Sequence, residues 1–142
     1  MRILQPPGWA QPRGYSNGVA AEGTLVFVAG QIGWNAECGF ESDDLVAQTR
    51  QALENVVAVL AEAGATPADI AHMTWYITDK REYAAATREI GRAYREVIGD
   101  HYPAMTLVQV AALLEDRAKV EIEVTAVVGR DAERGMRDAK GT

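Results

Sequence analysis

The stretch from residue 43 to residue 64, "DDLVAQTRQALENVVAVLAEAG", has the periodicity of an amphipathic helix, and segments typical of β-strands precede and follow it. Small or apolar side chains recur at every third or fourth position, namely Leu45, Thr49, Leu53, Val56, Leu60 and Ala63. Ser42 or Asp43 is expected to cap the start of this helix, and Gly64 stands where a glycine commonly ends one. A helix between two strands can cross over a sheet, so this stretch predicts a crossover helix.

The other predicted elements complete the order ββαβαββ. They are a β-hairpin over 15–34 with its turn at Glu22–Gly23, a strand over 70–78, a helix over 81–98, and two strands over 103–110 and 119–127. Gly30, inside the hairpin, is expected to mark a β-bulge or a close approach of the backbone to another segment. Both helices are expected on one face of one sheet, which leaves the other face in need of cover.

The length of 142 residues favours a single domain over residues 1–142. Residues 1–13 are rich in proline and are expected to form an extended arm, and the polar residues 129–142 a flexible tail. No apolar run approaches the roughly 20 residues of a membrane-spanning helix, and Pro6 and Pro7 stand where a signal peptide needs an apolar core. We therefore expect a cytoplasmic protein with no membrane partner.

Charge and the scarcity of metal ligands exclude several classes of protein. The net charge of −6 argues against a general binder of nucleic acids or of anionic membranes. Cys38 is the single cysteine, and His72 and His101 lack the spacing of a metal-binding motif, so no metal site is expected.

Two strands near the C-terminus raise the question of a ligand site. Met105 and Leu107 share one face of the first strand, and Glu121 and Glu123 share one face of the second. We expect Met105 and Leu107 on the uncovered face of the sheet. Such a half-apolar face should be buried by self-association. The glutamates then belong either to a solvated sheet face or to one wall of a ligand cleft.

Three segments carry a resemblance to a known family. These are "GYSNGVAAEGTLVFVAGQIG", "QTRQALENVVAVLAEAGAT" and "YPAM…VEIEVTAVV", in this order and within residues 14–128. They resemble the RidA/YjgF family of small reactive-intermediate deaminases, whose members are also labelled endoribonuclease-like. The resemblance implies an α+β fold like that of chorismate mutase and a homotrimer with small-molecule clefts between subunits. It also implies that no cofactor is needed.

The same resemblance implies where a site would be. Deaminating members hydrolyse enamines and imines such as 2-aminoacrylate to keto acids and ammonia. Carried over residue by residue, the family pattern makes Glu121 the catalytic residue that handles water. It assigns the lining of the ligand cleft to Tyr15, Gly30, Thr87, Ala104, Met105 and Leu107. Three positions depart from the pattern: Met105 replaces the arginine that grips the substrate carboxylate, Ala29 replaces a serine, and Thr87 replaces an asparagine.

These departures leave three functions open. The first is hydrolysis of an enamine or imine that lacks a small α-carboxylate, since efficient turnover of 2-aminoacrylate is not expected with Met105. The second is a non-catalytic trimer that binds a small ligand or a partner. The third is an endoribonuclease, against which the acidic charge and the lack of a histidine acid/base pair both count.

Arginines elsewhere in the chain could replace the missing one. Whether Arg13, Arg81 or Arg117 reaches the cleft cannot be decided from the sequence. Another set, Arg88, Arg92 and Arg95, alternates with glutamates on the predicted second helix and indicates a solvated helix face.

Overall fold

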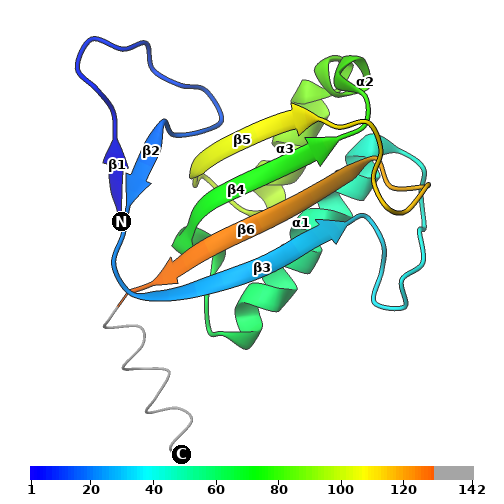
Figure 1. Ribbon diagram of the computed structural model, residues 1–142, viewed down its shortest axis with the longest axis horizontal. Coiled ribbons are helices and arrows are strands. Elements are labelled where there is room, and N and C mark those ends of the chain that lie inside the picture. The colour runs from blue at the N-terminus through cyan, green and yellow to red at the C-terminus, as the bar shows by residue number, and fades with distance from the viewer. Residues whose placement is uncertain (130–142) are drawn as a thin grey trace, which may run out of the picture.

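A four-stranded sheet with the strand order β3-β6-β4-β5 forms the centre of the computed structural model, which describes residues 1–129 (Figure 1). Its strands are β3 (Thr24–Ile32), β4 (Ile70–Ile77), β5 (Ala104–Gln109) and β6 (Val120–Val128). β6 is antiparallel to both of its neighbours, β3 and β4, whereas β4 and β5 are parallel. Helices α1 (Leu45–Glu62), α2 (Lys80–Ala85) and α3 (Thr87–Val97) all lie on one side of this sheet. The predicted mixed α+β fold, with its crossover helices on one face, is confirmed.

Helix α1 connects β3 to β4 and ends as predicted, at a glycine with a positive φ of 67°, Gly64. A short 3-10 helix, η1 (Pro67–Asp69), leads from it into β4. The helix begins one residue later than predicted, because the Asp44 side chain, and not that of Ser42 or Asp43, accepts a hydrogen bond from Ala47 N at 2.9 Å.

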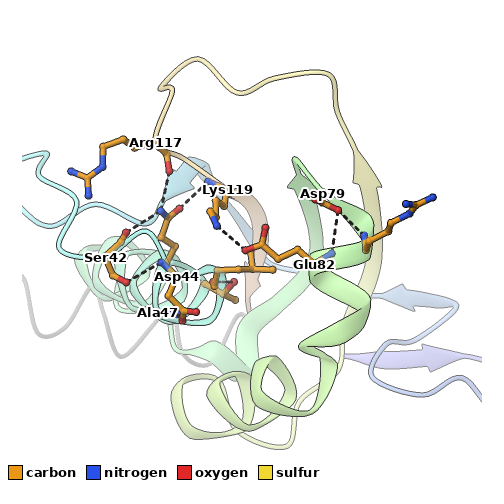
Figure 2. A network of polar contacts seen from close by, with 11 residues as sticks. Ser42, Asp44, Ala47, Asp79, Glu82, Arg117 and Lys119 are labelled. Atoms are coloured by element: carbon orange, nitrogen blue, oxygen red, sulfur yellow. Dashed lines mark hydrogen bonds and ion pairs between the residues drawn. The ribbon is translucent and has the colours of Figure 1, made fainter.

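A buried glutamine, Gln48, fastens the first turn of α1 to the segment before β6. Figure 2 shows Ser42, Arg117, Lys119 and Glu82, which belong to the same polar network. Gln48 Nε2 donates to the carbonyl oxygens of Ser42 at 3.0 Å and Arg117 at 2.9 Å. Gln48 Oε1 accepts from Lys119 N at 2.8 Å. Lys119 Nζ in turn contacts Glu82 Oε1 of α2 at 2.8 Å. This network holds the start of β6 against both helical segments and so fixes the position of the strand that carries Glu121.

The predicted second helix over 81–98 is two helices, α2 and α3, separated at Ala86. The side chain of Asp79 caps α2 by accepting from Arg81 N and Glu82 N. Ala86 has φ −114° and ψ 13°, outside the helical range, so the helical repeat does not continue across it. Thr87 is exposed for this reason and is not part of the buried stripe, which consists of Ile90, Ala93 and Tyr94.

The predicted N-terminal hairpin is wrong in its pairing. Strand β2 (Gly18–Ala20) pairs with β1 (Arg2–Leu4), inside the predicted arm, and forms a separate two-stranded sheet. β3 pairs with β6 and not with β2. The reason lies at Gly23, where a Cβ atom would stand 1.8 Å from the Val128 carbonyl oxygen. The expected turn therefore packs against the end of β6, and the chain enters the β3–β6 pairing directly.

The predicted placement of Met105 and Leu107 on the open face is also wrong. In the parallel pair β4–β5, Met105 lies opposite Met73 and Leu107 opposite Trp75. Met73 and Trp75 are buried under the helices, and Met105 and Leu107 pack against the same core. Alternation in a strand shows which residues share a face but not which face is covered.

The open face nevertheless carries exposed apolar side chains. Leu25 is 57% exposed, Phe27 is 72% exposed and Val108 is 41% exposed. They come from the two edge strands, β3 and β5. Phe27 pairs with Thr125 and Val108 with Tyr76, which places these side chains on the same face as Glu121 and Glu123. These residues, and not Met105, therefore give the open face the apolar surface that favours self-association.

Residues 130–142, which make up nearly all of the predicted tail 129–142, lie outside the described residues. Within residues 1–129, no helix is both long enough and apolar enough to cross a membrane.

Candidate functional site

Glu121, the predicted catalytic residue, lies beside Gly30 on the open face of the sheet. The β3–β6 register shifts between Val28 and Gln31, which is the β-bulge predicted at Gly30. A Cβ atom on Gly30 would stand 2.5 Å from Glu121 Oε1, so the close approach is confirmed as well. The glycine therefore leaves room for the glutamate side chain to lie over the bulge.

The neighbouring carboxylate, Glu123, is engaged by a tyrosine. Tyr76 OH donates a hydrogen bond to Glu123 Oε1 at 2.5 Å. This bond is the main cause that raises the pKa of Tyr76, followed by burial and by the negative charges of Glu123 and Glu121. The carboxylate of Glu121 has no hydrogen bond or ion pair with any residue from 1 to 129. Of the two carboxylates, Glu121 is therefore the one free to contact a water molecule or a ligand.

A cavity of about 330 Å³ lies on the other side of the sheet, between β4, β5, the two short helices and the N-terminal segment. Two predicted ligand-binding residues, Thr87 and Met105, are part of its wall. Aromatic side chains supply much of the remainder, among them Tyr83, Tyr94 and Tyr102. Its size and mixed lining are typical of a small-molecule site.

Tyr94 is held in place in this wall, and burial favours the uncharged form of both Tyr94 and Tyr83. Tyr94 OH donates to the carbonyl oxygen of His101 at 2.5 Å, and its ring stacks on Tyr102 with centroids 5.6 Å apart. Burial raises the pKa of both Tyr83 and Tyr94 above the ordinary value of 10.0. The tyrosines therefore contribute a polar but neutral surface.

The other predicted ligand-binding residues lie elsewhere. Ser16 N donates to the Pro103 carbonyl oxygen at 2.9 Å and forms an isolated bridge with Ala104, which places Tyr15 beside the start of β5. Tyr15 is 41% exposed. Leu107 packs into the core and does not line the cavity.

The predicted site residues therefore fall on two sides of one sheet. Met105 pairs with Met73 and Glu121 pairs with Tyr76 on the same central strand. Residues 73 and 76 are separated by an odd number of positions without a bulge between them, so their side chains point to opposite faces. A single copy of the chain cannot present Met105 and Glu121 to one ligand.

Of the three candidate replacement arginines, one lies at the cavity. Arg13 is part of its wall. Arg117 contacts Asp43 Oδ1 at 2.9 Å and lies over the Phe40 ring, in another part of the protein. Arg81 is exposed at the start of α2 and does not line the cavity.

Sequence reasoning missed a further arginine, Arg95, which lines the same cavity from α3. Arg88, Arg92 and Arg95 are all exposed, as predicted for a solvated helix face, and Arg95 in addition borders the cavity. The sequence did contain a clue to this role, one helical turn before Arg95. Gly91 lies inside the helix, where glycine is unfavourable, and neither a turn nor a helix end accounts for it.

The part of the chain that the structure describes contains no cluster of side chains suited to bind a metal ion. No group of three or more histidine, cysteine, aspartate or glutamate side chains converges there in a way that could hold a metal ion. The arrangement offers instead a free carboxylate on one face and an aromatic, arginine-bearing cavity on the other.

Comparison with known proteins places this arrangement in a family. A family model described as Endoribonuclease L-PSP matches residues 9–128. The chain is 42% identical over 105 residues to a RutC family protein of Haemophilus influenzae, covering 74% of this chain and 80% of the relative. It is 35% identical over 108 residues to the 2-iminobutanoate/2-iminopropanoate deaminase of Salmonella typhimurium, again covering 74% and 80%.

A solved structure agrees with these matches. The structure of the Rid family protein YyfB from Yersinia pestis, described as a protein of unknown function, superposes with a TM-score of 0.80 at 32% identity, covering 89% of this chain and 98% of that one. The family model and the solved structure thus agree with this chain in sequence and in fold over nearly all of the described residues. The chain belongs to the RidA/YjgF family, the family whose model is described as Endoribonuclease L-PSP.

Proposed function

We propose that the protein hydrolyses an enamine or imine in clefts formed between copies of the chain, with Glu121 as the residue that activates water. The observation that carries this proposal is the carboxylate of Glu121, which lies over the Gly30 bulge and has no partner among residues 1–129. A relative that is 35% identical to this chain over 108 residues is named as a deaminase of 2-iminobutanoate and 2-iminopropanoate.

The chemistry requires only a positioned acid/base group. An enamine is first protonated on carbon to give the imine. Water then adds to the imine carbon to form a carbinolamine, which loses ammonia to leave the carbonyl product. Glu121 accepts a proton from the attacking water and returns it to the departing nitrogen, as a general base and then a general acid. The overall reaction takes up one water for each ammonia released and needs no oxidant.

The cleft requires a second copy of the chain, because Met105 and Glu121 are on opposite faces of the sheet. The exposed side chains of Leu25, Phe27 and Val108 give the open face an apolar surface that a second copy would bury. We propose a homotrimer in which Glu121 of one copy faces the cavity of the next. Tyr15, Gly30, Thr87, Ala104 and Met105 would then lie in or beside the resulting cleft.

Met105 sets a limit on the substrate. Its thioether offers no charged donor, so a carboxylate beside it forgoes hydrogen bonds worth about 1.5–3 kcal/mol each. We therefore propose that the substrate is not held by a small α-carboxylate at this position, and that 2-aminoacrylate is a poor substrate.

A panel of imines tests the proposal. An amino-acid oxidase generates imino acids in place, and semicarbazide traps whatever imine the protein has not hydrolysed. We expect the wild-type protein to lower the semicarbazone yield for at least one imine, and Glu121→Gln to restore it to the level in buffer. Equal yields with both proteins, below the level in buffer, would show that Glu121 is not the catalytic group.

A second function, non-catalytic binding of a small ligand, is supported by the position of the cavity. The cavity is lined by the face of the sheet opposite to the one that carries Glu121, so a ligand could occupy it without contacting the Glu121 of the same chain. If no member of the panel is hydrolysed while a ligand binds in the cavity, the binding function is the correct one.

A further inference from the structure

The charged side chains from residues 1–129 that line the cavity between β5 and α3 are all positive. Arg13 and Arg95 both contribute to its wall, and no aspartate or glutamate from residues 1–129 does. Neither arginine forms an ion pair with another described residue, although the protein as a whole carries a net charge of −6. Two unpaired guanidinium groups at one cavity in an acidic protein form a local site for an anion.

A glycine in the middle of α3 makes room for one of these arginines. Gly91 lines the cavity, and a Cβ atom at this position would stand 3.3 Å from Arg95 Nη1. Glycine is a poor residue for a helix interior, so its presence there needs a reason. Here its lack of a side chain lets the Arg95 guanidinium fold back by one helical turn, across residue 91 and toward the cavity.

The second arginine is carried by an anchored segment. Arg13 precedes Gly14, which has a positive φ of 78° and also lines the cavity. Two residues later, Ser16 is fixed to the segment before β5 through its N–H, which donates to Pro103, and its hydroxyl, which donates to the Tyr102 carbonyl oxygen at 2.5 Å. Arg13 is thus tethered beside the cavity and does not depend on a free arm for its position.

A third group in the wall lacks a partner. Trp75 is 2% exposed, and its indole Nε1 has no hydrogen-bond acceptor among the described residues. An unpaired buried N–H is costly, and most such groups in proteins are paired. Trp75 is part of the cavity wall while its Nε1 is buried, so the indole N–H senses a ligand in the cavity through the side chain that lines it.

We propose that this cavity binds a carboxylate ligand with an apolar or aromatic body. The guanidinium groups of Arg95 and Arg13 hold the carboxylate, and the tyrosine rings pack on the body. Arg95 and Arg13 thereby replace the arginine that Met105 lacks, at a different position in the cavity. This inference deepens the proposed function, on which it rests for the identity of the ligand as substrate: an imine or enamine acid larger than 2-aminoacrylate.

Benzoate and its neutral counterpart benzamide are suitable probes, because they share a ring and differ in charge. The indole N–H resonance of Trp75, assigned with the variants Trp9→Phe and Trp34→Phe, reports on the cavity directly. We expect benzoate to shift this resonance in a saturable way and benzamide to bind at least about tenfold more weakly, since it forms no charge-assisted bond.

Arginine variants then identify the anion-binding groups. We expect Arg95→Gln and Arg13→Gln each to weaken benzoate binding about tenfold. Arg92→Gln is the matched control, because it removes the same charge from the same helix at an exposed position outside the cavity wall. Arg92→Gln should change the affinity less than about twofold.

The results separate this inference from the proposed function. No saturable shift with benzoate, equal binding of benzamide, or an equal loss in Arg92→Gln and Arg95→Gln would overturn the inference, even if imines are hydrolysed. Glu121→Gln is expected to bind benzoate as well as the wild type while it loses hydrolysis. Benzoate binding that depends on Arg95, in a protein that hydrolyses no imine, would support the inference and refute the proposed function.

Discussion

Met105 and Glu121 lie on opposite faces of the central sheet, on strands β5 and β6 that are separated by β4. The relationship follows from backbone register alone, since their partners Met73 and Tyr76 point to opposite sides of β4. It means that the carboxylate and the arginine-bearing cavity face one ligand only when copies of the chain associate. The expected behaviour of the protein follows from this separation.

The first expectation concerns assembly. Light scattering should give a mass about three times the 15.4 kDa of one chain, because the open face exposes Phe27 and Leu25. Phe27→Glu should reduce the mass toward that of the monomer by placing a charge in the contact. Val59→Glu, a matched change at a 40% exposed position on the helical side, should leave the mass unchanged. A wild-type mass of 15.4 kDa would contradict the proposed clefts.

Gly30→Ala should displace the carboxylate of Glu121, the proposed catalytic group. The new methyl group would stand 2.5 Å from Glu121 Oε1 and 2.9 Å from Cγ, so the glutamate side chain must move. We expect a loss of stability of about 1–3 kcal/mol in urea unfolding and a loss of imine hydrolysis. Gly129→Ala is the control, because no atom of residues 1–127 lies within 4 Å of the added atom. Unchanged hydrolysis in Gly30→Ala would show that the contact with Gly30 does not position Glu121.

Gly91→Ala should raise the free energy of unfolding and at the same time lower the affinity for benzoate. Alanine favours the helix interior by up to about 1 kcal/mol over glycine. Its methyl group would crowd Arg95 Nη1, 3.3 Å away, and push the guanidinium from the cavity. Benzoate titration should therefore show weaker binding, while urea unfolding shows a gain. In an Arg95→Gln background the same change should not alter the affinity further; a full additional loss would mean that Gly91 acts on the cavity independently of Arg95.

Tyr94→Phe should change the response of stability to alkaline pH. Burial raises the pKa of Tyr94 in the folded state above the ordinary 10.0, so its stabilising effect is complete below pH 10.0 and is lost as pH rises further. At neutral pH the variant should lose about 1 kcal/mol with the hydrogen bond to His101. Above pH 10.0 the difference in unfolding free energy between the variant and the wild type should become smaller, because only the wild type is destabilised by ionisation of Tyr94. Urea unfolding between pH 7 and pH 11 measures both effects, and a constant gap would contradict the assigned cause.

The elements with strong local signals could be predicted from the sequence. The repeat in α1 and the glycine at its end depend on neighbouring residues, so their pattern was sufficient. Gly30 was informative for the same reason, since a glycine inside a strand has few explanations. The family resemblance supplied Glu121, whose free carboxylate no local pattern indicates.

The remainder depended on contacts between distant segments. The face of Met105 was misassigned because it is set by pairing with Met73, far away in the sequence. The hairpin was misassigned because Gly23 packs against Val128, at the other end of the described chain. The position of Arg95 at the cavity was missed because its side chain lies over Gly91, in the space that a larger residue would occupy. The pattern of charges along the helix does not reveal this contact.

The most direct test of the central claim is a crystal structure of the assembled protein soaked with benzoate. We expect the carboxylate of benzoate between Arg95 and Arg13, with Glu121 of a neighbouring copy facing the same cleft. A structure in which Glu121 faces solvent in every copy, or in which benzoate lies away from both arginines, would contradict the account.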